Sequence, residues 1–403
     1  MNPDLKKLQP YPFEKLKALK ASCQFKNGQP PIEEHIALSI GEPKHEAPKF
    51  VLDCIANNLD KINSYPLTRG DIELRKAITN WLTRRFKLST NALDPEKHVL
   101  PVTGTREALF SFAQCFIDRK DAPLVLMPNP FYQIYEGAAY LSGAEPYFYN
   151  TTKESRYLPD FDAIEETTWQ RCQLIYICTP GNPTGSVISK QQLIKLIKLS
   201  QQYDFIIASD ECYSEIYFDE NNPPTGLLEA AESCGNINYT NCIVFHSLSK
   251  RSNLPGMRSG FVAGDAQLIE AYLLYRTYHG CAMPPVHQIA SISAWNDEEH
   301  VKLNRELYVK KFAAVTEILS PVIDLSMPDA GFYLWLNTPI NDTVFAKELY
   351  ENQNVTVLPG SYLSRKNDAI NPGEHHVRLA LVAPYDECVT AAKRIKEYLQ
   401  TLN

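Results

Sequence analysis

The sequence predicts an α/β fold in which helices cover a large, mostly parallel sheet, followed by a smaller α+β domain. The first observation is a series of short apolar, β-branched runs between about residues 95 and 265, which is typical of buried strands. The second is a segment between two of these runs, "QQLIKLIKLSQQYD", in which Leu193, Leu196 and Ile197 recur at helical spacing. The order strand, helix, strand indicates parallel pairing. The strand-like runs are "APLVLMPNP", "CQLIYICTPGNP", "DFIIASDE", "NCIVFHSLSK" and "SGFVAGD".

Three segments are expected along the chain. Residues 1–45 form an arm that joins the smaller domain or a partner subunit, with "YPFEKLKALKASC" as an amphipathic helix and "HIALSIG" as a strand. Residues 46–290 form the large domain. Residues 291–403 mix a long helical segment with isolated strand-like pieces, which is typical of a small α+β domain. These pieces are "GFYLWLN", "NVTVLPG" and "HHVRLALV".

The composition excludes several classes of function. The 403 residues carry a net charge of -7, and the basic residues are scattered, so we expect no nucleic-acid partner. No run approaches the roughly 18 to 20 apolar residues of a membrane span, and the amino terminus lacks the apolar centre of a signal peptide, so a cytoplasmic protein without membrane contact is expected. The ten cysteines contain no C-x-x-C pair, so we expect neither a disulfide nor a metal site.

The segment "SLSKRSNLPGMRSG" carries a lysine, two arginines and several hydroxyls around a Pro-Gly bend. Most lysines are solvated surface residues. Lys250, however, is expected to end a strand at the mouth of the sheet. There, nearby cations such as Arg251 and Arg258 would lower the pKa of its amine and favour imine formation. The hydroxyls of Ser247 and Ser249, with Arg258, would then serve an anion, for which phosphate is the natural choice.

Other polar groups follow neighbouring strands. Asp210 ends an apolar run in "FIIASDECY", with Tyr213 three positions later, although a helix N-cap is the alternative for this aspartate. Asn182 lies in "TPGNPTG", which alone is a turn signal. In "VTGTREAL" small residues precede a predicted helix, whose amino end favours anions. Ligands bind outside the carboxyl ends of the strands in open α/β sheets, so we expect these groups to share a site.

Taken together, these motifs resemble one family. The ordered set "SYPLTRGDIELR", "VTGTREALF", "NPFYQIYEG", "TPGNPTG", "SDECYSEI" and "SLSKRSNLPGMRSG", followed by "HHVRLAL", is similar to the fold type I, class I/II aminotransferases that use pyridoxal 5′-phosphate. Each motif is weak alone, but the set runs from Gly41 to Arg378 in the right order. The resemblance implies an enzyme that acts on small amino and keto acids as a homodimer, with active sites at the subunit interface.

The resemblance also implies a role for each group around the cofactor. Lys250 would form an imine with the cofactor aldehyde and then move a proton between the substrate Cα and the cofactor. Asp210 would keep the pyridinium nitrogen protonated, so that the ring withdraws electrons. Asn182 and Tyr213 would hydrogen-bond the phenolic oxygen, and Tyr132 would stack on the ring. The residues implied for the phosphate, the last of them from the neighbouring subunit, are Gly104, Thr105, Arg106, Ser247, Ser249, Arg258 and Tyr65.

On the substrate side, the resemblance assigns the α-carboxylate to Arg378, whose planar fork suits bidentate binding, together with Gly41 and Asn182. Read alone, an arginine in a strand is more often a surface or ion-paired residue. The finer pattern, including "GEPKH", "YRTYHGCAMPP" and "SAWNDEEHV", resembles the bacterial succinyldiaminopimelate aminotransferases. Their acceptor carries additional carboxylates. Candidates to bind those carboxylates, unless they are solvated or ion-paired, are Lys44, Arg69 and Arg276.

The implied reaction is amino transfer between glutamate or 2-oxoglutarate and N-succinyl-2-amino-6-ketopimelate, a step of lysine biosynthesis. One alternative is an aminotransferase for aspartate, aromatic or other amino acids. A second is a pyridoxal-phosphate-dependent C–S lyase. A non-enzymatic regulator domain would need a DNA-binding extension, for which the short amino-terminal segment leaves no room, and Lys250 is present.

Overall fold

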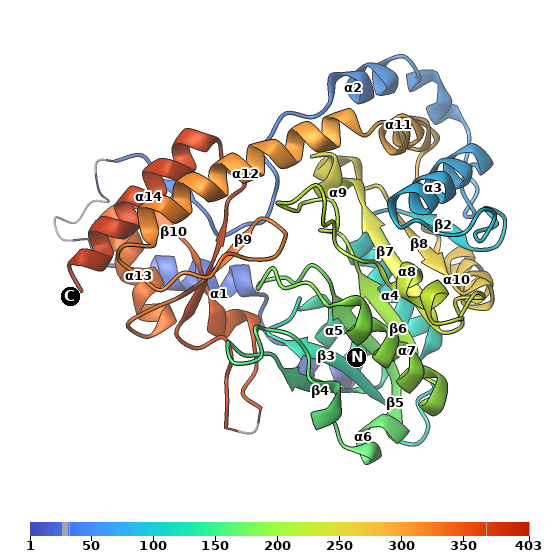
Figure 1. The fold of residues 1–403 in the computed structure, drawn as a ribbon, viewed down its shortest axis with the longest axis horizontal. Helices are drawn as coiled ribbons and strands as arrows, with labels where there is room; N and C mark the ends of the chain where they lie inside the picture. Colours follow the sequence, from blue (N-terminus) through green and yellow to red (C-terminus); the bar gives the residue numbers. More distant parts are fainter. Residues whose placement is uncertain (26–30, 32, 368, 403) are drawn as a thin grey trace.

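The large sheet confirms the predicted α/β fold. The computed structural model describes residues 1–25, 31, 33–367 and 369–402. Its main sheet has seven strands in the order β2-β8-β7-β6-β5-β3-β4 (Figure 1). All neighbouring pairs are parallel except those of β8, which runs antiparallel to both β2 and β7. The strands are β2 (Val99–Val102), β3 (Leu124–Asn129), β4 (Glu145–Asn150), β5 (Cys172–Cys178), β6 (Ile206–Asp210), β7 (Cys242–Ser247) and β8 (Gly260–Gly264).

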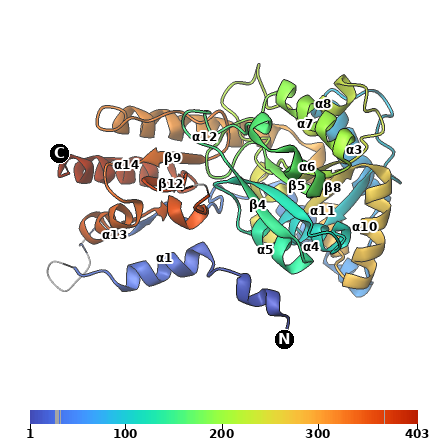
Figure 2. The same ribbon diagram turned by 90° about the horizontal axis from the view of Figure 1, so that it is seen from below.

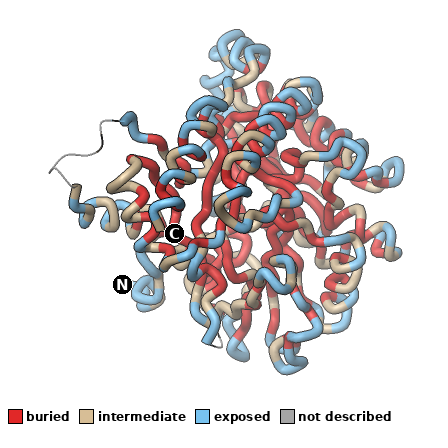
Figure 3. The backbone as a smooth tube through the Cα atoms, turned by 60° about the vertical axis from the view of Figure 1, so that its left-hand side comes forward, coloured by how far each residue is buried: buried red, intermediate tan, exposed pale blue. Residues whose placement is uncertain are grey.

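Helices bury both faces of this sheet. Along β3, Leu124 and Leu126 pack into one core cluster, whereas Val125 and Met127 pack into the other, because successive side chains of a strand point to opposite faces. The first cluster is covered by α3 (Ile72–Arg85), α7 (Lys190–Tyr203), α8 (Leu227–Ser233) and α11 (Pro285–Asn296). The second is covered by α4 (Thr105–Phe116), α5 (Ile134–Ser142) and α10 (Ala266–His279). Figure 3 shows the buried strands inside a shell of partly exposed helices.

The carboxy-terminal residues build a second, smaller core around an antiparallel sheet of order β11-β12-β9. The long helix α12 (Glu299–Leu319) reaches this part from the side of α11 (Figure 1). Its other elements are β9 (Tyr333–Asn337), α13 (Asp342–Gln353), β10 (Val355–Thr356), β11 (Leu358–Pro359), β12 (His376–Ala380) and α14 (Tyr385–Gln400).

The amino-terminal segment lies against this second part. The predicted helix is present as α1 (Pro12–Ala21), which packs on α13 and β11 below the molecule in Figure 2. The predicted strand is short: only β1 (Ile36–Ala37) pairs, in parallel with β10. The remaining elements are α2 (Lys49–Ala56), α6 (Glu166–Arg171), α9 (Leu248–Arg251) and the 3-10 helices Pro3–Lys7, Leu59–Asn63, Phe161–Ala163, Pro255–Met257 and Gly360–Leu363.

Among the residues that the structure describes, no helix has both the length and the apolar character needed to cross a bilayer. All ten cysteines have free thiols. Cys172, Cys178 and Cys242 are buried in strands, where a free thiol packs as a small apolar side chain.

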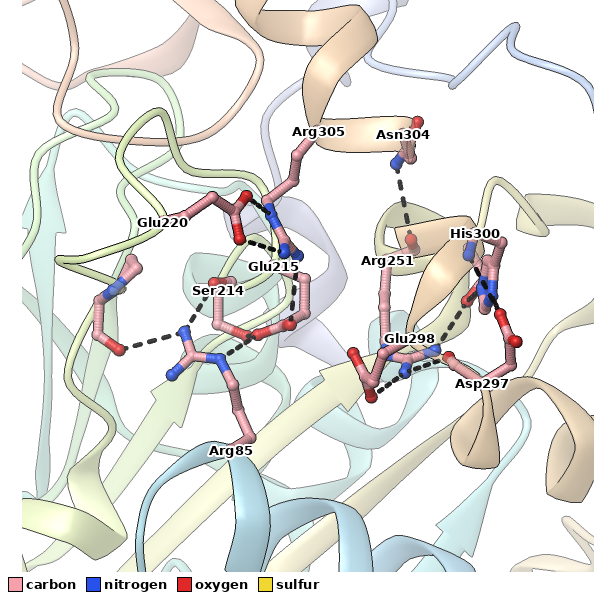
Figure 4. A network of polar contacts seen from close by, with 12 residues as sticks. Arg85, Ser214, Glu215, Glu220, Arg251, Asp297, Glu298, His300, Asn304 and Arg305 are labelled. Carbon is pink, nitrogen blue, oxygen red and sulfur yellow. Dashed lines mark hydrogen bonds and ion pairs between the residues drawn. The ribbon is translucent and has the colours of Figure 1, made fainter. Parts of the chain in front are cut away.

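Buried ion pairs join α3 and the segments that follow β6 and β7 to α12 (Figure 4). Glu215, in the segment after β6, is 3% exposed and accepts a 2.6 Å hydrogen bond from Nε of Arg85 on α3. Arg305 of α12 lies 3.9 Å from the same carboxylate and forms a bidentate pair with Glu220 at 2.6 and 2.7 Å. Arg251, next to Lys250, is buried and donates to Glu298 at 2.6 Å. The network therefore ties the segments beside Asp210 and Lys250 to the helix that leads into the second core.

Candidate active site

A cavity of about 650 Å³ lies at the carboxyl ends of β5, β6 and β7, between the main sheet and the second part of the chain. This is the edge at which the sequence predicted a site. The amino-terminal residues Tyr11 and Phe13 also face it. The predicted site residues that line this cavity are Gly41, Thr105, Arg106, Tyr132, Asn182, Asp210, Tyr213, Ser247, Ser249, Lys250, Arg258 and Arg378.

The sequence predicted that a strand ends at Lys250, but the strand ends before this residue. The strand β7 ends at Ser247, and Lys250 belongs to the short helix α9. The helix begins there because the Ser247 hydroxyl accepts a 3.1 Å hydrogen bond from the backbone N–H of Ser249. The Lys250 amine points into the cavity and donates to the carbonyl of Gly41 at 2.5 Å.

The pKa of the Lys250 amine is lowered to about 8, chiefly because burial disfavours its charged form, with the charges of Arg378 and Arg106 adding to the effect. The expected lowering is therefore present, but the neighbouring cations differ from those predicted. Arg251 is turned away and paired with Glu298. A substantial fraction of the amine is thus neutral near pH 7.5, and a neutral amine is the form that attacks a carbonyl.

Asp210 is the buried acid of the cavity. It ends β6 and is 4% exposed. Its Oδ2 accepts a 2.7 Å hydrogen bond from the hydroxyl of Tyr135, and its Oδ1 accepts one from the backbone N–H of Cys212 at 3.3 Å. Burial raises the pKa of this carboxyl above its usual value. A cationic partner in the cavity would reverse that shift, so the position suits a protonated ring nitrogen.

The amino end of α4 forms one wall of the cavity. Gly104 is the N-cap residue and has a φ of 93°. A Cβ at this position would lie 2.1 Å from Nη2 of Arg258, so a glycine is needed for the guanidinium to approach the helix end. Backbone N–H groups, the helix dipole and a guanidinium together favour an anion here. The Ser247 hydroxyl, which was predicted to bind this anion, is also engaged in capping α9.

Arg378 and Asn182 meet from distant parts of the chain. Nη1 of Arg378, on β12, donates to Oδ1 of Asn182 at 2.8 Å, and its Nη2 donates to the carbonyl of Ser39 at 2.9 Å. The guanidinium lies over the ring of Tyr333, 4.3 Å from its centroid. Its buried Nε has no hydrogen-bond partner among the described residues. A buried donor left in this state fits an anionic ligand.

Arg106, the second residue of α4, also lies at the amino end of this helix. Its Nε donates to the hydroxyl of Tyr132 at 2.8 Å, and its Nη2 donates to the hydroxyl of Tyr11 at 3.2 Å. The guanidinium thus points toward the amino-terminal arm rather than toward Arg258. Tyr213, across the cavity, shares a 3.1 Å hydrogen bond with the hydroxyl of Tyr333.

Five predicted site residues are not among those that line the cavity of this chain, although one of them, Gly104, caps the helix that forms a wall of it. Arg276 is fully buried and paired with Glu107, both of whose oxygens lie 2.8 Å from its Nη1, so its prediction as a pocket cation is corrected. The guanidinium of Arg69 donates to the carbonyl of Glu96 at 2.5 Å. Lys44 is exposed outside the cavity, and the Tyr65 ring is fully exposed.

Several residues of the site were not predicted from the sequence. Tyr135 lies inside the quoted motif "NPFYQIYEG", so its bond to Asp210 could have been sought from its spacing to Tyr132. Tyr11, Phe13 and Tyr333 gave no local signal, because they reach the cavity only through packing of the two ends of the chain.

One group of side chains away from the cavity has donor atoms close enough to hold a metal ion. The ligand atoms of Glu107, His279 and Cys281 lie within 4.8 Å of one another. The Glu107 carboxylate is already neutralised by Arg276 and also accepts from the Thr103 hydroxyl at 2.8 Å. We therefore assign no metal to this group.

Comparison with known proteins decides the family. Residues 33–395 match the family described as aminotransferase class I and II. The chain belongs to this family. It is a fold type I aminotransferase, and its cofactor is pyridoxal 5′-phosphate.

Individual relatives cover nearly the whole aminotransferase. It is 31% identical over 395 residues to the LL-diaminopimelate aminotransferase of Nitratidesulfovibrio vulgaris, which covers 96% of both chains. The crystal structure of an aminotransferase from Neisseria meningitidis superposes with a TM-score of 0.93, at 48% identity, over 99% of this chain and all of that one. A probable N-succinyldiaminopimelate aminotransferase from Thermus thermophilus superposes with a TM-score of 0.84, at 24% identity, over 96% of this chain and 99% of that one. The last likeness concerns the fold alone.

The cavity of the aminotransferase fits its cofactor. It holds an amine with a lowered pKa, a buried carboxylate and, at the amino end of α4, a glycine that admits the Arg258 guanidinium. These are the partners that an aldehyde, a ring nitrogen and a phosphate require.

Proposed function

We propose that this aminotransferase moves the amino group between glutamate and N-succinyl-2-amino-6-ketopimelate, giving N-succinyl-LL-2,6-diaminopimelate in lysine biosynthesis. The observation that carries the proposal is a cavity that contains three arginines without a carboxylate partner, Arg106, Arg258 and Arg378, among the described residues. Such a cavity suits a phosphorylated cofactor and a substrate with more than one carboxylate. Amino transfer itself follows from the family.

The cofactor, when bound, supplies an aldehyde that reacts with amines and a ring that withdraws electrons from the carbon bearing the amino group. Lys250 offers a neutral amine to that aldehyde and accepts or returns a proton at Nζ. Asp210 would hold a proton on the ring nitrogen of the bound cofactor through a charge-assisted hydrogen bond. Asn182 and Tyr213, which line the cavity, would hydrogen-bond the phenolic oxygen of the cofactor, and Tyr132 would lie against its ring.

Substrate orientation depends on the second part of the chain. The Arg378 fork binds the α-carboxylate, and its fixed contacts to Asn182 and Ser39 hold it in place. The Gly41 backbone lies beside it, close to the Lys250 amine. The substrate is thereby presented with its Cα toward Nζ of Lys250, where the proton is exchanged.

A second substrate has specific support. The relatives at 31% identity are named LL-diaminopimelate aminotransferases, and their substrate has the same seven-carbon chain with a free second amino group. The two substrates differ by one succinyl group, hence by one negative charge replacing one positive charge at the distal end. The alternatives of aspartate, aromatic substrates and C–S lyase chemistry are not better supported.

Steady-state assays with a panel of substrates test this proposal. The holoenzyme is given glutamate with the succinylated keto acid, or 2-oxoglutarate with LL-diaminopimelate, aspartate, phenylalanine or acetylornithine. We expect the succinylated pair to have the highest kcat/KM. A preference for free LL-diaminopimelate would favour the second candidate, and a preference for aspartate or phenylalanine would refute both.

The covalent binding of pyridoxal phosphate to the cofactor-free protein is expected to accelerate with pH up to about 8 and then level off. Only the neutral amine attacks the aldehyde, and burial lowers the Lys250 pKa to about 8. An exposed lysine, with a pKa of about 10.4, would give a rate that still rises above pH 9. Stopped-flow absorbance between about pH 6.5 and 9.5 measures this profile. A rate that continues to climb through that range contradicts the assignment.

We also propose that the enzyme is a homodimer in which Tyr65 serves the partner's phosphate site. Tyr65 is fully exposed in the single chain, and large apolar side chains around it, Leu59, Ile62 and Leu67, are 55%, 69% and 75% exposed. An exposed apolar segment of this kind is typical of an interface.

Mixing two inactive variants tests the sharing of Tyr65. Tyr65→Ala and Lys250→Ala subunits, each inactive alone, should regain roughly a quarter of wild-type activity after random reassociation, because half of the dimers are mixed and each holds one intact site. Light scattering confirms the dimer. If mixed dimers form but stay inactive, Tyr65 belongs to its own subunit's site or to no site.

A further inference from the structure

We propose that Lys311 of α12 is a positioning residue for the reaction. Through His45 it holds the segment that carries Gly41 against the end of β12, the strand that carries Arg378. Lys311 is not among the residues that line the cavity, so it acts on the substrate only through these two segments. The inference rests on the proposed function, in which Gly41 and Arg378 bind the substrate α-carboxylate.

The Lys311 amine is buried and has a partner for each of its donors. The residue is 2% exposed. Its amine lies 2.6 Å from Nε2 of His45 and donates to the carbonyls of Leu381 and Val382 at 3.3 and 3.4 Å. Burial lowers the pKa of the amine to about 8, with the charge of Glu387 on α14 opposing the shift, so most of it is protonated at neutral pH. A protonated amine has three N–H donors, and three acceptors therefore fix its position.

Lys311 differs from the buried arginines outside the cavity because it has no counter-charge beside it. Arg251, Arg276 and Arg305 each pair with a carboxylate. Among the described residues, no carboxylate lies within 4.0 Å of the Lys311 amine. The ring of Tyr308, 5.2 Å from Nζ, is a weaker source of negative potential. A buried cation of this kind lowers stability relative to an apolar side chain of similar length, so the segments that it joins explain its presence better than stability does.

His45 extends the contact to the loop that follows Lys250. A protonated amine can only donate, so Nε2 of His45 accepts from Lys311 and the imidazole proton lies on Nδ1. Nδ1 then donates to Oδ1 of Asn304 at 2.7 Å, and the same oxygen accepts from Nδ2 of Asn253 at 3.0 Å. Burial lowers the pKa of His45, which favours the neutral ring that this arrangement requires. One chain of hydrogen bonds thus runs from α12 to the loop after α9.

The segments held by Lys311 lie close in sequence to the groups proposed for the α-carboxylate. His45 follows Gly41 by four residues. Leu381 follows Arg378 by three residues. The Gly41 carbonyl also accepts from the Lys250 amine at 2.5 Å, so the segment before His45 reaches the reacting centre. A shift of this segment would move Gly41 relative to Arg378, and a misplacement of about 1 Å in groups that orient a substrate is costly.

The test compares alanine with ethylamine, which is alanine without its carboxylate. Both amines condense with the cofactor of the holoenzyme, and the initial change in cofactor absorbance, measured against concentration, gives an apparent dissociation constant. For Lys311→Met we expect the constant for alanine to rise roughly 10- to 100-fold, because the groups that bind the carboxylate are displaced, and that for ethylamine to change less than about two-fold. Lys310→Met, the same change at the exposed neighbouring position of α12, should affect neither constant.

A double variant tests whether Lys311 acts through His45. His45→Phe removes the imidazole acceptor and should also weaken alanine selectively. Because the two residues form one unit, we expect the double variant to weaken alanine no more than Lys311→Met alone. Effects that multiply in the double variant would show that the two side chains act independently and would overturn the inference. His45 is only partly buried, so His45→Phe remains informative if Lys311→Met does not fold.

The two ligands separate positioning from a merely structural role. Damage to the fold would weaken alanine and ethylamine alike, so an equal loss for both, or no loss for either, contradicts the role of Lys311. A wild-type protein that binds alanine no better than ethylamine would refute the α-carboxylate site of the proposed function and, with it, this inference. The identity of the long acceptor does not enter the measurement, so a failure of the substrate panel leaves the role of Lys311 standing.

Discussion

Lys250→Ala is expected to lower amino transfer by roughly a thousand-fold or more, because the group that exchanges the proton at the substrate Cα is removed. Cofactor binding should be retained in part, since Asp210, Arg258 and the amino end of α4 are untouched. The wild-type protein is expected to be yellow and to become covalently labelled at Lys250 when reduced with borohydride. The variant should bind cofactor that is not retained after reduction and denaturation.

Two controls make the Lys250 result specific. Lys302→Ala removes an exposed lysine of α12 and should leave turnover and labelling unchanged. Circular dichroism of Lys250→Ala should match that of the wild type, so that loss of activity is not loss of fold. Normal transamination by Lys250→Ala, or labelling of a different lysine, would remove the basis of the proposed mechanism.

Glu215→Gln is expected to lower the free energy of unfolding by about 3–5 kcal/mol, because it leaves the buried guanidinium groups around it without their shared counter-charge. The carboxylate is 3% exposed, accepts from Nε of Arg85 at 2.6 Å and lies 3.9 Å from Nη1 of Arg305 (Figure 4). Urea unfolding followed by fluorescence at pH 7 measures the loss. A change below 1 kcal/mol would show that solvent or the Glu220 carboxylate compensates the arginines.

The loss of unfolding free energy caused by Glu215→Gln should depend on pH in a defined direction. Burial alone would raise the pKa of this carboxyl, but the charges of Arg85, Arg251 and Arg305 together hold it below its usual value of 4.5. A lowered pKa means that its stabilisation is complete above about pH 4.5 and is lost as the pH falls through the folded-state value. The difference between wild type and variant should thus shrink in acid. Lys49→Ala, which breaks the exposed pair with Asp53, should change stability by less than about 1 kcal/mol at either pH.

Periodicity alone was sufficient to predict much of the fold. The apolar runs became β3, β5, β6, β7 and β8, and the helical stripe of Leu193 and Leu196 became α7. A strand buried on both faces has to be apolar along its whole length, so the pattern is visible locally. The antiparallel direction of β8 and the shortness of β1 were not visible, because they depend on which neighbour each strand meets.

The position of Lys250 illustrates a smaller error of the same kind. The apolar run "CIVF" ends at Phe245, but the predicted strand was extended through "HSLSK" to the lysine. The Ser247 hydroxyl instead caps α9, and the backbone turns before Lys250. A capping hydrogen bond is local, but whether a serine uses it depends on the space beyond the strand.

The chemistry of the site was encoded locally, since each reactive group follows a strand or opens a helix. Lys250, Asp210, Asn182 and the loop before α4 could be found because the carboxyl ends of parallel strands converge at one edge of a sheet. The sequence did not show which arginines would be ion-paired and which would face the cavity. Arg276 is neutralised by Glu107, Arg251 by Glu298, and Arg106 remains uncompensated beside Tyr11. Whether a cation pairs with an acid or faces a cavity depends on residues more than forty positions away in the sequence. Only packing of the chain brings those residues within the few ångströms over which charges pair strongly.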